Sequence, residues 1–150
     1  MGGNHKLSRQ AGISLIEVLI ALLVLALGVL GAVLLQSNAL RYSASAADQT
    51  QASFIAYDLL DRMRANPSEL AGYAISVPAG CRPTSTGSSI LATDLADFSQ
   101  AVSCVLPGGE AEVSIHGQQA RVSISWSEER TVAAGGTSTL IASALIGGEP

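Results

Sequence analysis

The chain has 150 residues, enough for one small domain, and a net charge of −4 at pH 7. Its residues are 48% hydrophobic, and no run of basic residues is present, so composition excludes nucleic-acid binding as the main role. The first twelve residues carry Lys6 and Arg9 and no acid, whereas the rest of the chain holds six arginines and twelve acidic residues. The positive-inside tendency therefore predicts a cytoplasmic N-terminus and an acidic remainder across a membrane.

A long apolar segment follows this basic start. Residues 13–35 contain a single charged side chain, Glu17, and residues 18–35 contain none. As a helix, the 23 residues would be about 34 Å long, sufficient to cross a hydrocarbon core of about 30 Å. We predict a transmembrane helix over 13–35. Placing a charged carboxylate inside a lipid bilayer costs free energy, so its presence in this segment indicates a functional role for Glu17.

A cleaved secretory signal peptide is the alternative interpretation of this segment. Residues 44–46 read Ala-Ser-Ala, a small-residue pattern that would place cleavage after Ala46. The apolar region of a signal peptide is, however, only about 7–15 residues long. Here it is longer, and Arg41 and Tyr42 separate it from the cleavage pattern. These features favour a segment that stays attached to the chain.

The helical pattern continues beyond the apolar segment. No glycine or proline interrupts residues 32–66, and apolar residues recur between 44 and 63 at the three- and four-residue spacing of an amphipathic helix. Pro67 ends the pattern, because the residue before a proline is biased away from the helical conformation. We predict one helix from about residue 13 to 65, with an amphipathic second half in residues 36–66.

Residues 67–150 predict a small domain that contains a short helix and a sheet. A helical stripe extends from Leu91 to Val102, with Thr93 or Asp94 as the predicted N-cap. Two alternating segments predict strands around 113–115 and 122–126, joined by a hairpin turn at 116–119, and residues 138–146 predict a third strand. Three strands alone are marginally stable, so we expect the sheet to pack on the apolar face of the long helix.

Two cysteines are present, Cys81 and Cys104. An even pair in an exported chain predicts one disulfide, here closing off the Ser/Thr/Gly-rich residues 84–89. We interpret it as a link within one chain; a bond between chains is the alternative.

Catalytic and metal-binding interpretations find little support in the sequence. The histidines, His5 and His116, have no cysteine or carboxylate at ligand spacing, so no metal site is predicted. The serines lack a GxSxG elbow. Trp126 alternates with apolar residues and is interpreted as core or domain surface. We therefore expect neither an enzyme nor a cofactor. Asp58, Asp61 and Arg62 are interpreted as a solvated helix face or as subunit contacts.

The start of the chain resembles a known family. A short basic leader, the stretch Gly12-Ile13-Ser14-Leu15-Ile16-Glu17 and the long apolar run together resemble the type III signal of type IV pilins and pseudopilins. Three later stretches are similar to PilV-type minor pilins, also called type IV pilus modification proteins. They are residues 57–66 (YDLLDRMRAN), 106–109 (LPGG) and 122–126 (VSISW).

The resemblance implies a fold and a maturation route. The fold would be the α+β type IV pilin fold, a long N-terminal helix packed on a small antiparallel sheet. Residues 1–12 would be a leader that prepilin peptidase removes between Gly12 and Ile13, with N-methylation of Ile13. Residues 13–35 would be the transmembrane or filament-core helix, 36–66 its amphipathic half and 67–150 a periplasmic domain. Glu17 would neutralise the terminal amine of a neighbouring subunit during assembly; a carboxylate that snorkels to the headgroups is the alternative.

The implied function is that of a minor pilin in the initiation or tip complex of a type IV pilus, supporting twitching motility and cell adhesion. Its partners would be prepilin peptidase, other minor pilins, the major pilin and the inner-membrane assembly platform. The chain would cross the bacterial inner membrane once before it enters the pilus. A type II secretion pseudopilin is the first alternative. A signal-anchored periplasmic binding protein or enzyme is the second.

Overall fold

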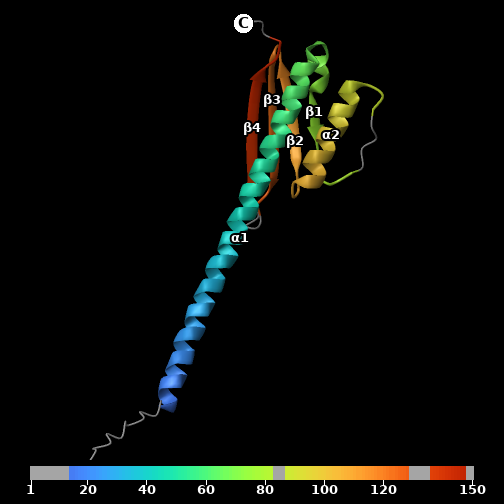
Figure 1. Ribbon diagram of the computed structural model, residues 1–150. Helices are drawn as coiled ribbons and strands as arrows, with labels where there is room; N and C mark the ends of the chain where they lie inside the picture. Colours follow the sequence, from blue (N-terminus) through green and yellow to red (C-terminus); the bar gives the residue numbers. More distant parts are fainter. Residues whose placement is uncertain (1–13, 83–86, 129–135, 148–150) are drawn as a thin grey trace, which may run out of the picture. The chain divides into compact units, whose positions relative to one another are not determined.

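The computed structural model of the protein describes residues 14–82, 87–128 and 136–147. In chain order (Figure 1) its elements are helix α1 (Leu15–Ala65), the 3-10 helix η1 (Pro67–Tyr73), strand β1 (Ile75–Val77), helix α2 (Ile90–Val105) and strands β2 (Glu110–His116), β3 (Gln119–Ser127) and β4 (Thr137–Leu145). The chain divides into two units, Met1–Leu40 and Arg41–Pro150. Helix α1 contributes residues to both.

Helix α1 confirms the long helix predicted from the sequence. It extends over 51 residues and ends at Ala65, two residues before Pro67, which occupies the first position of η1. Proline is tolerated there because the first amide of a helix has no intrahelical partner. Within the second unit, α1 buries one stripe of side chains at helical spacing. The members of this stripe are Ala52, Ile55, Ala56, Leu59, Leu60 and Met63.

The sheet has four strands in the order β1-β2-β3-β4, and every neighbouring pair is antiparallel. The hairpin predicted at 116–119 is present: His116 pairs with Gln119, and Gly117, at a φ of 60°, is the first of the two loop residues. Because the second loop residue, Gln118, does not have a positive φ, the turn is of type II′, which suits the twist of the flanking strands. The predicted strands correspond to β2, β3 and β4, whereas β1 was not predicted.

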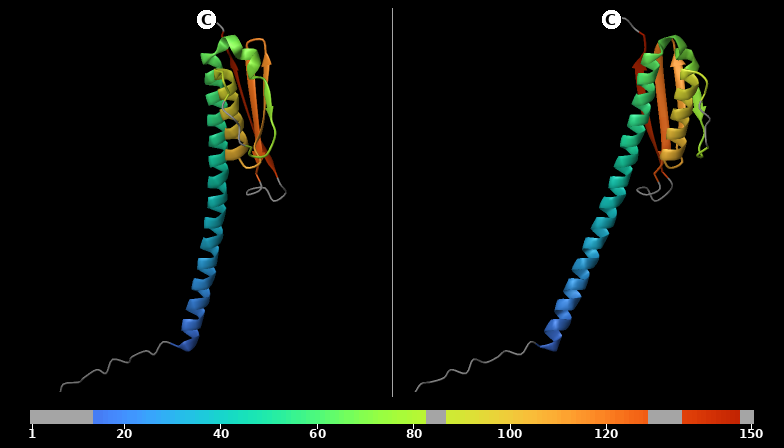
Figure 2. Two further views of the ribbon diagram at one scale, coloured as in Figure 1. Left: turned by 90° about the vertical axis from the view of Figure 1, so that its right-hand side faces the viewer. Right: turned by 45° about the vertical axis from the view of Figure 1, so that its right-hand side comes forward.

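Both helices cover the same face of the sheet (Figure 2). The core between them combines the α1 stripe with Phe98 and Val102 of α2 and with the inward-facing residues of the strands. Trp126 belongs to this core, only 3% exposed, and its indole Nε1 donates a hydrogen bond to Glu128 Oε2 at 3.1 Å. The structure therefore has the α+β, pilin-like fold that was predicted, and the second half of α1 contributes one side of its core.

Helix α2 begins earlier than predicted. Its N-cap is Ser89, whose Oγ accepts a hydrogen bond from the amide of Ala92 at 3.1 Å. The predicted caps, Thr93 and Asp94, lie inside the helix, so that prediction was wrong. Serine is as good a cap as aspartate, and Asp94 is buried and used in a contact with α1 described below.

The predicted disulfide is present. Cys81, which follows β1, is bonded to Cys104 in the last turn of α2, with 4.5 Å between the two Cα atoms. The bond joins residues 23 positions apart and so ties α2 to the end of β1. Part of the Ser/Thr/Gly-rich segment that it closes off, residues 83–86, lies outside the described residues.

Candidate functional site

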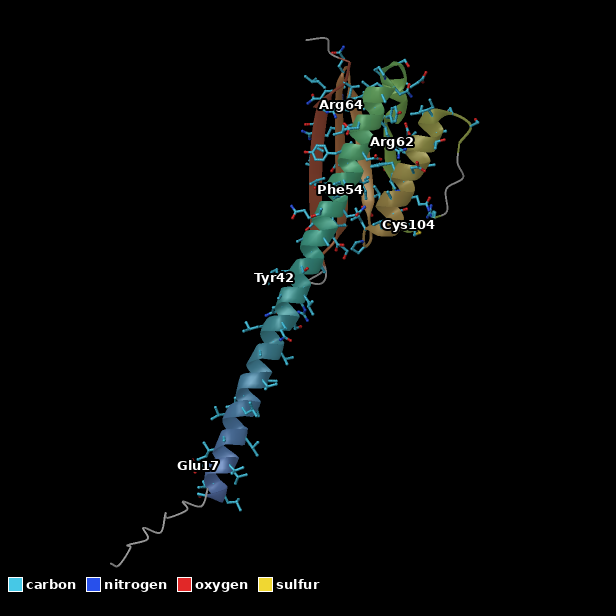
Figure 3. The ribbon with its side chains drawn as sticks, viewed as in Figure 1. Glu17, Tyr42, Phe54, Arg62, Arg64 and Cys104 are labelled. Atoms are coloured by element: carbon cyan, nitrogen blue, oxygen red, sulfur yellow. A yellow bond between two sulfur atoms is a disulfide. The ribbon has the colours of Figure 1, made fainter. Side chains whose placement is uncertain are left out.

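The first turn of α1 contains the carboxylate that the sequence singled out. The carbonyl of Ser14 accepts hydrogen bonds from the amides of Glu17 at 2.9 Å and Val18 at 3.3 Å. Ser14 thus occupies the N-cap position, and Glu17 lies three residues later in the first turn, where the positive end of the helix dipole favours a negative charge. The side chain of Glu17 is exposed (Figure 3).

Ser14 was not among the residues predicted to have a role. The spacing Ser14-x-x-Glu17 is that of a capping box, in which a serine and a glutamate bracket the first turn of a helix. This pattern could have been read from the sequence alone. The spacing predicts a local contribution of Glu17 to helix initiation in addition to any role in assembly, and the two must be separated by experiment.

The first unit presents an apolar helical surface without protein cover. An 18-residue window of α1 has a mean hydropathy of 3.1, and none of that window is buried within the structure. Its leucines, isoleucines and valines from Leu15 to Leu35 are each 47–78% exposed. By length and composition this part of α1 can cross a membrane. A surface of this size needs lipid or other helices around it.

A second cluster of polar groups links α1 to α2. The guanidinium of Arg62 contacts three carboxylates: its Nε lies 2.8 Å from Asp58 Oδ2, and its Nη1 lies 2.8 Å from Asp94 Oδ1 and 3.1 Å from Asp97 Oδ2. The hydroxyl of Tyr73 donates a hydrogen bond to Asp94 Oδ2 at 2.7 Å. Asp94 thus uses both carboxylate oxygens to hold η1 and α1 against α2.

This cluster corrects the interpretation of the helix face. Asp58 and Asp61 are exposed, as a solvated face requires, and Asp58 pairs with Arg62 four residues later on α1. Arg62, however, is committed to α2 of its own chain. Hydrogen bonding to Asp94 holds the pKa of its guanidinium above its usual range, against the opposing effect of desolvation, so Arg62 stays charged. Its partners could not be identified from sequence, because Asp94 is 32 residues away.

Because of Tyr73, the stability of the folded unit should depend on pH in the alkaline range. Burial, and then the hydrogen bond to Asp94, raise the pKa of its phenol. Below a pH of about 10 the phenol is neutral in both the folded and the unfolded chain. Above that pH the unfolded chain loses the phenol proton first, because the pKa is raised only in the folded state. The free energy of unfolding therefore falls as the pH rises. We expect Tyr73→Phe to flatten this decline, measured by thermal unfolding in detergent. Tyr57→Phe, which removes an exposed phenol on α1, should leave the decline unchanged. An unaltered slope in Tyr73→Phe would contradict this assignment.

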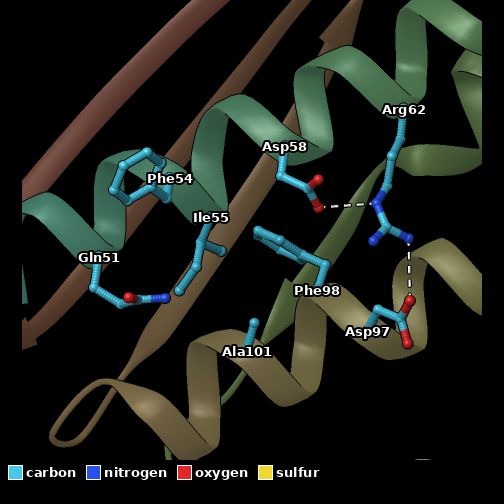
Figure 4. A pocket seen from close by; sticks show the side chains of 8 residues that line it. All are labelled: Gln51, Phe54, Ile55, Asp58, Arg62, Asp97, Phe98 and Ala101. Atoms are coloured by element: carbon cyan, nitrogen blue, oxygen red, sulfur yellow. Dashed lines mark hydrogen bonds and ion pairs between the residues drawn. The ribbon is translucent and has the colours of Figure 1, made fainter.

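Beside the Arg62 cluster lies a groove between α1 and α2 with a volume of about 470 Å³. Figure 4 shows its lining: Gln51, Phe54, Ile55, Asp58 and Arg62 come from α1, and Asp97, Phe98 and Ala101 come from α2. Within residues 14–82, 87–128 and 136–147, no group of three histidine, cysteine, aspartate or glutamate side chains could hold a metal ion.

Comparison with known proteins concerns the first turn of α1 and the apolar segment that follows it. Residues 7–33 match the model of the prokaryotic N-terminal methylation motif. The chain is type IV pilin-like. The match contains the Gly12–Ile13 junction, Glu17 and most of the apolar segment. No curated protein and no solved structure matches the chain.

The pilin-like motif accounts for several features at once. It indicates a structural rather than catalytic protein, and it implies processing by prepilin peptidase and assembly with other pilins. The motif and the uncovered apolar helix together fit a membrane-anchored pilin. Gly12 and Ile13, the predicted cleavage and methylation sites, lie outside the described residues, and the assembly role of Glu17 stays a prediction.

Proposed function

We propose that this chain is a PilV-type minor pilin that takes part in initiating or capping a type IV pilus, and so supports twitching motility and adhesion. The observation that carries the proposal is the order of features around the methylation motif. A glycine precedes the apolar segment instead of following it, so cleavage there would leave the membrane helix on the mature subunit. The folded unit with its disulfide follows on the same helix.

In this proposal the protein crosses the inner membrane once, with the N-terminus in the cytoplasm and the folded unit in the periplasm. Prepilin peptidase cuts between Gly12 and Ile13 and methylates the new amine of Ile13. The subunit then leaves the membrane and joins other minor pilins and the major pilin through the assembly platform. Glu17 pairs with the terminal amine of a neighbouring subunit, because a paired carboxylate is tolerated in an apolar environment where an isolated one is not.

N-terminal sequencing of the protein extracted from membranes tests the proposal. We expect the mature chain to begin at Ile13. Gly12→Leu should abolish cleavage, because a peptidase that accepts glycine at this position has no room for a side chain, and the precursor should then accumulate in the membrane. Gly3→Leu, a matched change further from the junction, should leave cleavage intact. A mature protein that begins at Ala47 and is released into the soluble periplasm would overturn the proposal.

A further inference from the structure

The face of the sheet that lies away from the helices carries a shallow hollow. None of the described helices covers this face (Figure 2). The hollow has a volume of about 270 Å³, and its size suits one small ligand, because pockets for drug-sized molecules measure about 300–1,000 Å³. We call it the outer hollow. Five side chains line it: Glu112 and Ser114 of β2, Arg121 and Ser123 of β3, and Ile141 of β4.

The register of β2 and β3 places four polar side chains of the outer hollow at the corners of a square. Glu112 is paired with Ser123, and Ser114 is paired with Arg121. Because alternate residues of a strand face the same side, all four lie on the outer face, and Glu112 and Arg121 are diagonal neighbours. On β4, Ile141 is paired with Ser123 and adds an apolar side chain, 58% exposed, at one edge.

The two charged groups of the outer hollow are not paired with each other. Diagonal neighbours on a sheet are about 7–8 Å apart, within reach of long side chains. Every ion pair between described residues nevertheless involves Arg62 or Arg64 of α1. Glu112 and Arg121 are both exposed, and an exposed ion pair contributes little to stability. A ligand that bridges the two groups therefore meets little competition from a direct contact between them.

Serine hydroxyls complete the polar groups of the outer hollow. Ser114 and Ser123 are half-buried, and neither hydroxyl is hydrogen-bonded to another described residue. A hydroxyl both donates and accepts hydrogen bonds, a carboxylate only accepts them, and a guanidinium only donates them. The planar fork of a guanidinium also matches a carboxylate in two parallel hydrogen bonds. The outer hollow thus offers Arg121 to a carboxylate, Glu112 to hydroxyl donors, and the serines to hydroxyls in either direction.

We propose that the outer hollow binds a uronic acid, a pyranose sugar that carries a carboxylate, as a unit of an acidic polysaccharide. Arg121 donates two hydrogen bonds to the sugar carboxylate, Glu112 and the serines bind ring hydroxyls, and Ile141 lies against the C–H groups of the ring. A neutral sugar would leave the guanidinium unused, and a zwitterion without a ring would leave Ile141 unused. The inference concerns the folded unit alone and depends neither on membrane insertion nor on pilus assembly.

Titration of the full chain in deuterated detergent with methyl β-D-glucuronide tests the site. Because the hollow is open and shallow, we expect a Kd on the order of 1 mM, measured from the broadening of the proton NMR signal of the sugar's methoxy group. Methyl β-D-glucoside has the same ring without the carboxylate. It should bind about tenfold more weakly, because it loses the charge-assisted pair with Arg121.

Substitutions in the outer hollow identify the groups that bind the sugar. Arg121→Gln should weaken glucuronide binding about tenfold and leave glucoside binding unchanged. Arg121→Lys keeps the charge but not the planar fork, and should weaken glucuronide binding about threefold. Glu112→Gln should weaken the binding of both sugars, because it loses a charged acceptor of their hydroxyls. These positions are exposed, so each variant should keep the thermal unfolding temperature of the unmodified chain.

Arg82→Gln is the matched control. Arg82 is also an exposed arginine and also lines a hollow that contains serines, Ser99 and Ser103, but no carboxylate lines that hollow. Its substitution should leave glucuronide binding unchanged. Equal losses in Arg82→Gln and Arg121→Gln would overturn the inference, because they would indicate a diffuse attraction of the anion to any arginine.

Three further outcomes would overturn the inference. Glucuronide and glucoside binding with equal affinity would show that the carboxylate is not recognised. Undiminished glucuronide binding in Arg121→Gln would place the sugar elsewhere on the chain. Glycerophosphoethanolamine, a zwitterion without a sugar ring, is titrated in parallel and should bind at least about tenfold more weakly; equal affinity for it would show that the outer hollow recognises paired charges and not a sugar.

Discussion

Glu17→Leu should leave the protein in the membrane but lower its recovery in sheared pili by about tenfold or more. Insertion should be preserved or improved, because a charge leaves the apolar segment. Cleavage should still occur, since Gly12 and the leader are unchanged. Incorporation should fall because the neighbouring amine then enters an apolar environment without a partner, and an unpaired buried charge costs about 3–5 kcal/mol. Immunoblots of sheared pili and of membranes from the same cells measure both quantities.

Two matched variants separate pairing from helix capping. Ser14→Ala removes the capping serine but keeps the carboxylate, so it should cost about 1 kcal/mol of local helix stability and leave incorporation intact. Glu17→Asp keeps the charge on a side chain one methylene shorter and should assemble poorly. Normal recovery of Glu17→Leu in pili would show that the carboxylate only snorkels. Absence of the unmodified protein from pili would favour the pseudopilin alternative.

Asp94→Ala should be the most destabilising single change among the three carboxylates that contact Arg62. Asp94 is 7% exposed and accepts bonds from both Arg62 and Tyr73, so its removal leaves a buried hydroxyl without its acceptor and takes one partner from the guanidinium. We expect a loss of about 2–4 kcal/mol in the free energy of unfolding. Thermal or denaturant unfolding of the full chain in detergent measures it.

Asp97→Ala is the control for this prediction. Asp97 also contacts Arg62, but its side chain is 49% exposed, and exposed ion pairs contribute about 0–1 kcal/mol. If Asp94→Ala and Asp97→Ala lower the free energy of unfolding equally, Asp94 stabilises the fold only as one of several surface charges. A large loss confined to Asp94 would establish it as the residue that fixes α2 against α1 and η1.

The elements that the sequence predicted well are those whose signals are local. The extent of α1 followed from hydropathy and from the absence of glycine and proline between residues 32 and 66. Strands β2 and β3 and their turn followed from strict alternation on either side of Gly117. The single cysteine pair predicted the disulfide, since no other pairing within the chain was possible.

What the sequence did not predict depends on tertiary contacts. Strand β1 has three residues, too few for a visible alternation, and exists because Ile75–Val77 pairs with the edge of β2. Asp94 looked like a helix cap because aspartate favours that position, but its burial beside Tyr73 and Arg62 comes from the packing of three separate elements. The groove likewise arises only when α2 lies against α1, and neither helix shows it alone.

The buried stripe of α1 also determines how the folded unit bears tension. A force drawn along the helix axis within residues 41–65 acts on the side chains from Ala52 to Met63 together, because all of them project from one rigid element into the same core. They would have to slide past the sheet at once, whereas the strands of a hairpin pulled apart from one end separate pair by pair. Forced unfolding is governed by the height of that barrier rather than by equilibrium stability. A folded unit of marginal thermodynamic stability can therefore still resist a pull along α1.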